Sequence, residues 1–90
     1  MLYIQHWQIK PGYHQKGAGK ILATGSPYAG AEIMGRYYDP GSIKGWILVE
    51  VEDQQVLYEH AAEWAEFLDW ETTPEFKDEE AAPICATIYG

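Results

Sequence analysis

The 90-residue sequence is poor in cysteine, with Cys85 as its one example. A single cysteine cannot form a disulfide within the chain, so the sequence excludes a small fold held together by disulfides. Nothing in the cysteine content indicates an oxidising compartment. We therefore expect a cytoplasmic location.

Long hydrophobic runs are also absent. The N-terminal segment MLYIQHWQIK has no basic leader, and Gln5, His6 and Gln8 interrupt its apolar residues. A signal peptide requires a continuous apolar region, and a membrane-spanning helix requires about 20 mainly apolar residues. The sequence therefore predicts neither a signal peptide nor a membrane partner.

Basic residues are scarce, because 6 lysines and arginines stand against 14 aspartates and glutamates, which gives a net charge of −8. Most of the acidic residues lie in residues 46–90, where Lys77 is the one base. An acidic surface repels the phosphate backbone, so we expect no nucleic-acid partner. The content of 47% hydrophobic and 14% aromatic residues excludes a disordered chain and indicates that large flat surfaces are buried.

The first half of the chain reads as a strand, a helix and a hairpin. Residues 2–9 alternate two partly apolar sets, which is typical of a strand, and KPG follows as a stop. Residues 13–24 predict a helix, although Gly17 and Gly19 weaken it. The segments 32–38 and 44–52 flank DPGS, whose proline and glycine suit the second and third positions of a turn.

The second half reads as a helix and a strand, followed by a tail. Asp53 is a suitable N-cap, and apolar residues from 57 to 68 recur with the period of a helix. WETTPEF predicts a strand that Pro74 restricts to an edge or an end of the sheet. Residues 78–90 form a C-terminal extension, and 84–89 fit either a strand or a helix. The apolar stripe of the helix comprises Leu57, Ala61, Trp64 and Leu68.

The order β-α-β-β-α-β is that of a ferredoxin-like α+β fold, an antiparallel sheet with both helices on one face. We expect residues 1–90 to form one such domain. Because the first and third strands carry apolar residues on both sides, the second sheet face also needs cover. The sequence therefore predicts a homodimer through the sheet faces, a dimeric α/β barrel.

One further feature is the set of segments HWQIKPG, MGRYY, GWILVE and LYEHAAEWAEFLDWETTPEFKDEEAA. Through these segments, nearly the whole chain resembles an uncharacterised family of short bacterial proteins in the dimeric α/β-barrel superfamily. That resemblance implies a small pocket between the sheet and the helices of each subunit. Superfamily members include cofactor-independent monooxygenases, haem-degrading enzymes, lactone isomerases and stress-responsive proteins, so the fold does not fix the function. The first helix is shorter here than in that family and carries two glycines. The resemblance therefore does not determine the shape of the pocket mouth.

Three residues are candidates for chemistry. His60 borders the apolar stripe of its helix, either as a half-buried histidine packed on Trp64 or as a proton donor or acceptor at the rim of the pocket. His6, in the first strand, is either satisfied in the dimer or exposed to the pocket. Arg36 and Glu50 lie on the two arms of one hairpin, and the sequence leaves open whether the register places them on the same face. Arg36 either pairs with Glu50 or binds the carboxylate of a ligand.

The expected ligand-binding residues are aromatic, and the expected site lies between the sheet and the helices. The ligand would be a small aromatic or apolar molecule. No cofactor is indicated, and no metal site either, because the pair His60 and Glu63 has no further ligands. The ligand-binding candidates are Trp46, Trp64 and Tyr37.

The sequence leaves two function classes open, and a third ranks below these two. The first is a small-molecule-binding homodimer, with activity of the cofactor-independent monooxygenase type as its enzymatic form. The second is a non-enzymatic dimeric interaction or structural protein, which a solid core would favour. The third is haem degradation, by loose analogy of His6, Trp46 and His60 with the haem-degrading members of the superfamily.

Overall fold

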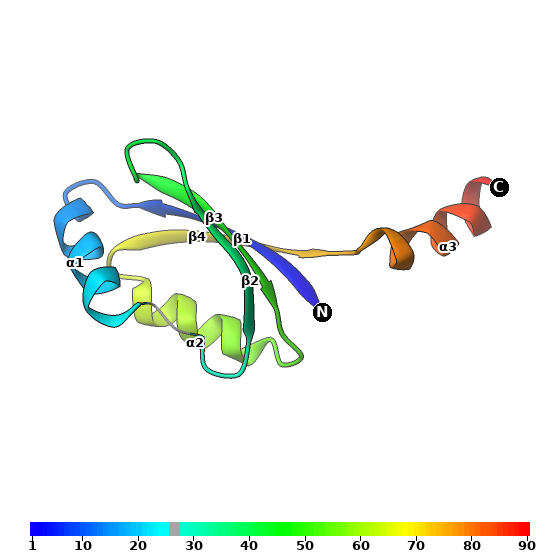
Figure 1. Cartoon of the computed structure of the whole chain (residues 1–90), viewed down its shortest axis with the longest axis horizontal. Helices are drawn as coiled ribbons and strands as arrows, with labels where there is room; N and C mark the ends of the chain where they lie inside the picture. Colours follow the sequence, from blue (N-terminus) through cyan, green and yellow to red (C-terminus); the bar gives the residue numbers. More distant parts are fainter. Residues whose placement is uncertain (26–27) are drawn as a thin grey trace.

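The structure, a computed structural model, describes residues 1–25 and 28–90, and this part of the chain forms four strands and three helices (Figure 1). The first six elements follow the predicted order βαββαβ, which confirms the α+β class. The strands are β1 (Leu2–Ile9), β2 (Glu32–Tyr38), β3 (Lys44–Glu50) and β4 (Leu68–Glu75). The helices are α1 (His14–Thr24), α2 (Gln55–Trp64) and α3 (Asp78–Tyr89).

The sheet has the strand order β2-β3-β1-β4, and each neighbouring pair is antiparallel. This arrangement is consistent with a ferredoxin-like fold, with α1 and α2 against one face of the sheet (Figure 1). Pro74 lies in β4, an edge strand, where its missing N–H removes no bond from the interior of the sheet. The predicted restriction of this strand to an edge is confirmed.

The core lies between the sheet and the helices, because alternate residues of the two central strands point toward the helices. On β1, Tyr3, Gln5 and Trp7 are buried, whereas the intervening residues are only half-buried on the outer face. On β3, Ile47 and Val49 are buried on the inner face. The helix α2 closes this core with Leu57 and Trp64.

The hairpin between β2 and β3 turns at DPGS as predicted. The N–H of Ser42 donates to the carbonyl oxygen of Asp39 over 2.8 Å, which closes a four-residue turn. Gly41 has φ of +94°, a conformation that glycine adopts without steric cost. The turn sets the register in which Tyr37 pairs with Trp46 and Tyr38 pairs with Gly45.

Helix α2 ends earlier than its apolar stripe predicted. Asp53 accepts a 2.9 Å hydrogen bond from the N–H of Gln55, but the N-cap of the helix is Gln54 and has no side-chain cap hydrogen bond, so the predicted N-cap lies one residue too early. The helix ends at Trp64, and Leu68 is the first residue of β4, paired with Ile9 of β1. The assignment of Leu68 to the helix was wrong because a buried leucine suits both elements. Pairing with β1 decides between them.

The C-terminal residues 78–90 leave the sheet and project away from the rest of the molecule (Figure 1). The segment 84–89, which the sequence left open, is part of helix α3. Glu80 accepts a 3.0 Å hydrogen bond from the N–H of Lys77, which supports the start of this helix. Within the described chain, no helix is long and apolar enough to cross a membrane.

Replacing Trp64 with alanine should lower the free energy of unfolding by about 3–5 kcal/mol, the usual cost of emptying a site that holds a buried large aromatic residue. The Trp64 side chain is 3% exposed, whereas that of Tyr58 on the same helix is 78% exposed. Tyr58→Ala is therefore the matched control and should change stability by about 0.5 kcal/mol or less. Urea denaturation at a fixed protein concentration measures both. A loss below about 1 kcal/mol for Trp64→Ala would contradict its place in the core.

Candidate functional site

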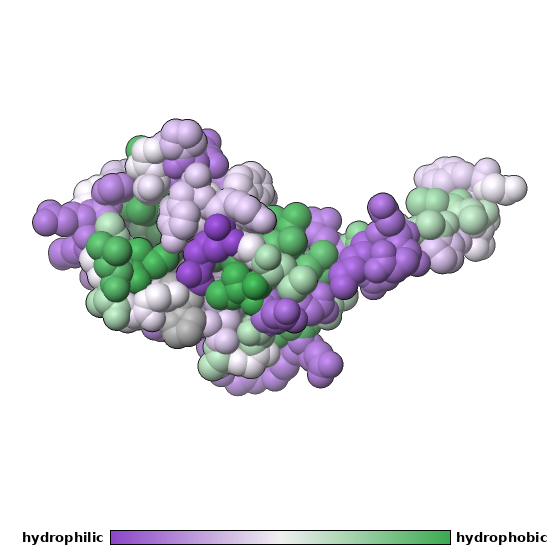
Figure 2. Space-filling view, viewed as in Figure 1, coloured by the Kyte–Doolittle hydropathy of each residue, from purple (hydrophilic) through white to green (hydrophobic). Residues whose placement is uncertain are grey.

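A pocket of about 370 Å³ lies between α1, α2 and the inner face of the sheet. Its walls are mainly apolar, and the space-filling view shows apolar side chains gathered over α1 beside a hollow in the surface (Figure 2). From α1 come Gly17, Ala18, Ile21 and Leu22. The sheet and α2 contribute Trp7, Ile47, Trp70 and Trp64.

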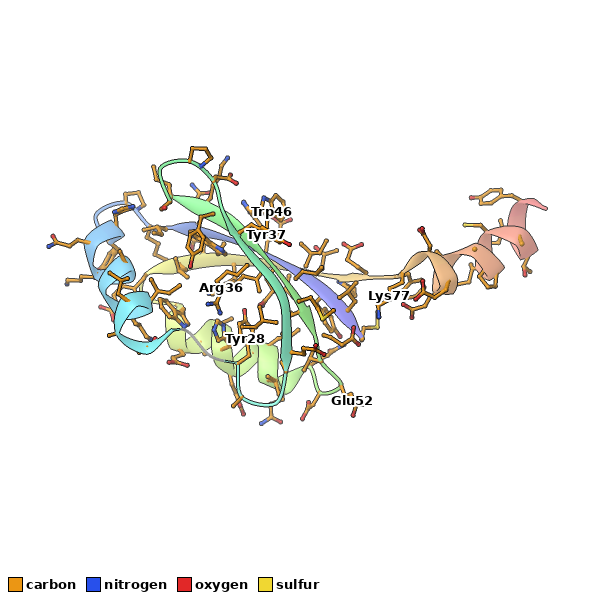
Figure 3. All side chains as sticks on the ribbon, in the orientation of Figure 1. Tyr28, Arg36, Tyr37, Trp46, Glu52 and Lys77 are labelled. Carbon is orange, nitrogen blue, oxygen red and sulfur yellow. The ribbon has the colours of Figure 1, made fainter. Side chains whose placement is uncertain are left out.

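Arg36 brings a permanent positive charge to this lining. It pairs in register with Ile47, a buried residue of the inner face, so its side chain points toward the helices (Figure 3). Its Nη1 donates to the carbonyl oxygen of Gly25 over 3.1 Å. Glu50 lies on the opposite face, where its carboxylate is 2.8 Å from the N-terminal ammonium of Met1. Arg36 and Glu50, whose relative register the sequence left open, therefore do not form a pair.

The indoles of Trp64 and Trp70 form much of the aromatic surface of the pocket. Lys20 of α1 lies over the Trp64 ring, with its Nζ 4.6 Å from the ring centroid. The indole N–H groups of Trp64 and Trp70 are buried and have no acceptor within hydrogen-bond distance among the described residues. A buried donor left without a partner costs about 1–3 kcal/mol.

Behind the pocket, a buried polar network joins the sheet to α2. The Tyr28 hydroxyl donates to Oε1 of Gln5, and Nε2 of Gln5 donates to Oγ1 of Thr72 over 3.1 Å. The ring of His60 stacks on that of Tyr28, with centroids 3.6 Å apart and planes 13° apart. Gln5 is fully buried, and it is satisfied because both ends of its amide are bonded.

Burial keeps the two stacked rings uncharged. It lowers the pKa of His60 to about 4, with the nearby positive charges of Arg36 and Lys20 contributing in the same direction. Burial also raises the pKa of the Tyr28 hydroxyl well above its ordinary value of 10.0, against a smaller opposing effect of Arg36. At neutral pH both groups are therefore neutral and lie close to the Arg36 cation.

His60 does not belong to the described lining of the pocket, although the sequence placed it at the rim. Its ring lies edge-on to that of Trp70, with centroids 5.5 Å apart, and 6.3 Å from that of Trp64. These indoles belong to the lining, so His60 stands one layer behind the surface that a ligand would touch. The sequence correctly placed His60 at the border of the apolar stripe of α2. The burial comes from Tyr28, which the sequence reasoning did not identify.

Trp46, Tyr37 and His6 lie on the outer face of the sheet, away from the pocket. Trp46 pairs with Tyr37 and with His6 in register, and the rings of His6 and Trp46 are 4.3 Å apart. The expected position of Trp46 between the sheet and the helices is therefore corrected. The physical reason is strand alternation, because Trp46 is one residue from the inward-facing Ile47 and must point outward.

This placement also bears on the haem analogy. His6 and Trp46 are on the outer face, whereas His60 is buried between the sheet and α2. The sheet separates the first two residues from the third, so the three do not form one haem site within the chain. His6, Trp46 and His60 as arranged in this chain therefore do not fit a haem.

Four residues of the site escaped the sequence reasoning. Gln5 carried a signal, because it is a polar residue between Tyr3 and Trp7 on the face that the alternation assigns to the core. Trp70 was recognised only as part of a strand, and Tyr28 lay outside every predicted element. The missed residues are Gln5, Trp7, Tyr28 and Trp70.

The lowered pKa of His60 predicts a loss of stability in acid. Between pH 6.5, the ordinary pKa of histidine, and about 4, the unfolded chain binds a proton at this site that the folded chain does not. The contribution is fully present above pH 6.5 and is lost as the pH falls toward 4. His60→Gln should therefore flatten the pH dependence of the free energy of unfolding in this window. His14→Gln, at an exposed position on α1, is the matched control and should keep the wild-type slope. Equal slopes for the wild type and His60→Gln would contradict the buried neutral state.

Comparison with known proteins gives one family. The DUF3303 family, described as a domain of unknown function, matches residues 1–89. No curated protein and no solved structure gives a significant match to the chain. Since the family match covers nearly the whole sequence, whose strands, helices and pocket are described above, the chain belongs to the DUF3303 family.

Proposed function

We propose that this protein is a homodimer that binds a small aromatic or apolar molecule in the pocket of each subunit. The observation that carries the proposal is the pocket itself, with a volume of about 370 Å³ and walls that include three indoles. Ligand sites typically have about 300–1,000 Å³, apolar and aromatic walls and a few polar groups. Protein interiors otherwise contain few voids larger than a water molecule. A pocket of this size therefore favours ligand binding over the alternative of a purely structural protein with a solid core.

Binding ranks above catalysis in this proposal. Catalysis in the manner of the cofactor-independent monooxygenases of the wider superfamily would require a proton acceptor that reaches the substrate. His60, the candidate for that role, lies behind the indoles of Trp64 and Trp70 and is neutral at pH 7. The polar groups of the lining that a ligand can reach include Arg36 and His14. These groups are better suited to orienting a bound ligand than to abstracting a proton from it.

The second part of the proposal is the homodimer, which the outer face of the sheet supports. Trp46 is 46% exposed and Tyr37 is 59% exposed, and the two are paired neighbours that project to the same side of the sheet (Figure 3). Leu2, Ile4 and Leu48 extend this apolar surface and are themselves only half-buried. A contiguous apolar face of an antiparallel sheet indicates a partner. A second copy offers an identical face and completes a twofold pair.

Ligand binding can be followed through the indole N–H signals of a ¹⁵N-labelled sample. Three of the four tryptophans line the pocket, and Trp46 on the outer face is an internal control. We expect naphthalene-2-carboxylate or its neutral amide to shift the signals of Trp7, Trp64 and Trp70 more than that of Trp46. A titration in which neither compound moves the three pocket signals would overturn the proposal.

Blocking the pocket gives a matched pair of variants. Ala18 lines the pocket, whereas Ala23 is exposed on the same helix outside it. Ala18→Phe should abolish these shifts because the new ring occupies the space of the ligand. Ala23→Phe should leave them intact. Equal binding by both variants would show that the compounds bind elsewhere.

The dimer is tested by sedimentation at micromolar concentration, where we expect a species of twice the 10.2 kDa chain mass. Trp46→Lys should shift the equilibrium to monomer, because it places a charge in the centre of the apolar face. Tyr58→Lys is the control, since Tyr58 is an exposed aromatic residue on α2, on the other side of the sheet. A wild-type protein that sediments only as a single chain would contradict this part of the proposal.

A further inference from the structure

We infer that helix α3 binds a second copy of this chain, where it packs on the end of the hairpin between β2 and β3. This inference rests on the homodimer of the proposed function and adds a second contact surface to the sheet face. The segment concerned, residues 76–90, is called the arm below.

Helix α3 presents a surface that its own domain does not cover. None of its described residues is buried, and the arm leads away from the sheet (Figure 1). The first turn is acidic, with Asp78, Glu79 and Glu80, and the second half is apolar (Figure 2). Ile84 is 47% exposed and Ile88 is 64% exposed. An exposed apolar stripe on a helix indicates a partner. The stripe comprises Ala81, Ile84, Cys85 and Ile88, at helical spacing.

A helix of this kind needs a contact surface in order to persist in water. α3 has 12 residues, and Pro83 lies inside it. Isolated helices shorter than about 12–15 residues are marginal, and an interior proline removes one hydrogen bond of the helix. Most helical stability in proteins comes from packing of the apolar face. Because its own domain buries none of the described residues of α3, a second molecule has to supply this packing.

The exposed area of the chain is that of one partner in a dimer. The chain exposes 6148 Å², whereas a monomeric protein of 10.2 kDa typically exposes about 5,300 Å². The excess of about 800 Å² equals the share that each partner buries in a standard interface. The radius of gyration is 15.3 Å, against about 12 Å for a compact domain of 90 residues. The projecting arm is the part of the chain that departs from a compact shape (Figure 1).

The arm is continuous with the sheet face that we assign to the dimer. α3 begins three residues after the last residue of β4, and Phe76 in between is 56% exposed. Lys77 lies 3.9 Å from Glu50, a residue on the outer face of β3. Exchange of arms between two copies therefore extends one interface, and a twofold axis repeats each of its contacts.

The charges at the two ends of the sheet decide where the arm lies on the second copy. At the Glu50 end, Leu2 pairs with Glu50 and Glu75, and the acidic first turn of α3 follows. At the other end, the Lys44 end, Gln8 pairs with Lys44. Two Glu50 ends placed together would bring two acidic arms into mutual repulsion. An antiparallel arrangement of the two sheets avoids this, because each arm then reaches the Lys44 end of the second copy.

The hairpin at the Lys44 end has groups that match those of the arm. Ile43 is 55% exposed, Trp46 is 46% exposed, and Lys44 is exposed between them. The isoleucines of α3 pack on the apolar pair, and the acidic first turn faces Lys44. Each part of the arm thus has a counterpart on the same chain, so a second copy covers it without a further kind of protein.

The test uses Cys85, the one cysteine of the chain, which is exposed within the apolar stripe. Ser42→Cys adds a second thiol, nearly isosteric with the serine, at an exposed position of the hairpin at the Lys44 end. A short bis-maleimide should join Cys85 of one chain to the new cysteine of the other and give a product of two chains on a denaturing gel. Glu52→Cys is the matched control, because it is exposed at the Glu50 end and should give no such product.

Sedimentation of a pair of α3 variants gives an independent measurement. Ile84→Glu places a charge in the stripe and should raise the dimer dissociation constant at least about tenfold, since the twofold axis repeats the change. Ala86→Glu adds the same charge on the opposite side of α3, where it is exposed, and should change the constant about twofold or less.

The outcomes separate this inference from the homodimer on which it rests. A cross-link from Ser42→Cys within one chain, identified by peptide mass spectrometry, would mean that the arm folds back on its own domain. A covalent dimer of the wild type would mean that two arms pair with each other. Either result overturns the inference and leaves the homodimer intact. The same holds for a wild-type dimer that shows neither the cross-link nor an effect of Ile84→Glu. A wild type that sediments only as a single chain overturns the homodimer as well.

Discussion

The packing of Trp7 between its two neighbouring strands is the constraint on which the rest of the structure depends. Trp7 pairs with Gly45 of β3 and with Trp70 of β4. Its indole covers Gly45 so closely that a Cβ atom there would lie 2.4 Å from the ring. Glycine at this position therefore makes room for the ring. The ring also meets Tyr38 edge-on at 5.4 Å, which connects the central strand to β2 and forms part of the pocket wall.

Because side chains alternate along each strand, the strand residues are divided between an inner and an outer face of the sheet. Once Trp7 faces inward, its neighbours Tyr3 and Gln5 do so too, while His6 and Trp46 face outward. The inner face acquires the pocket, and the outer face acquires the apolar surface that we assign to a second copy. A shift of one residue in register would exchange these tasks. The same strand pairing thus fixes the residues that line the pocket and the residues of the face that we propose to meet a second copy.

Several polar groups in the interior are connected through the side chain of Gln5. Gln5 receives the Tyr28 hydroxyl and reaches Thr72, so β1, β4 and the segment before β2 are joined through one amide. His60 stacks on Tyr28 and stays uncharged next to Arg36, so no second buried charge has to be solvated. Among the described residues that line the pocket, Arg36 carries the permanent charge.

The sequence by itself determined the order of the elements, the DPGS turn, the start of helix α2 near Asp53 and the burial of Trp64, because alternation, turn chemistry and helical period are local properties. It also identified Arg36 and His60 as residues of interest. The tertiary structure decided which face each strand residue occupies, and so moved Trp46 and Tyr37 away from the pocket and separated Arg36 from Glu50. It also brought Tyr28 onto His60 and Trp70 next to Trp7, contacts between segments far apart in the chain. Such contacts depend on strand register and on the packing of helices against the sheet, which no local pattern in the sequence encodes.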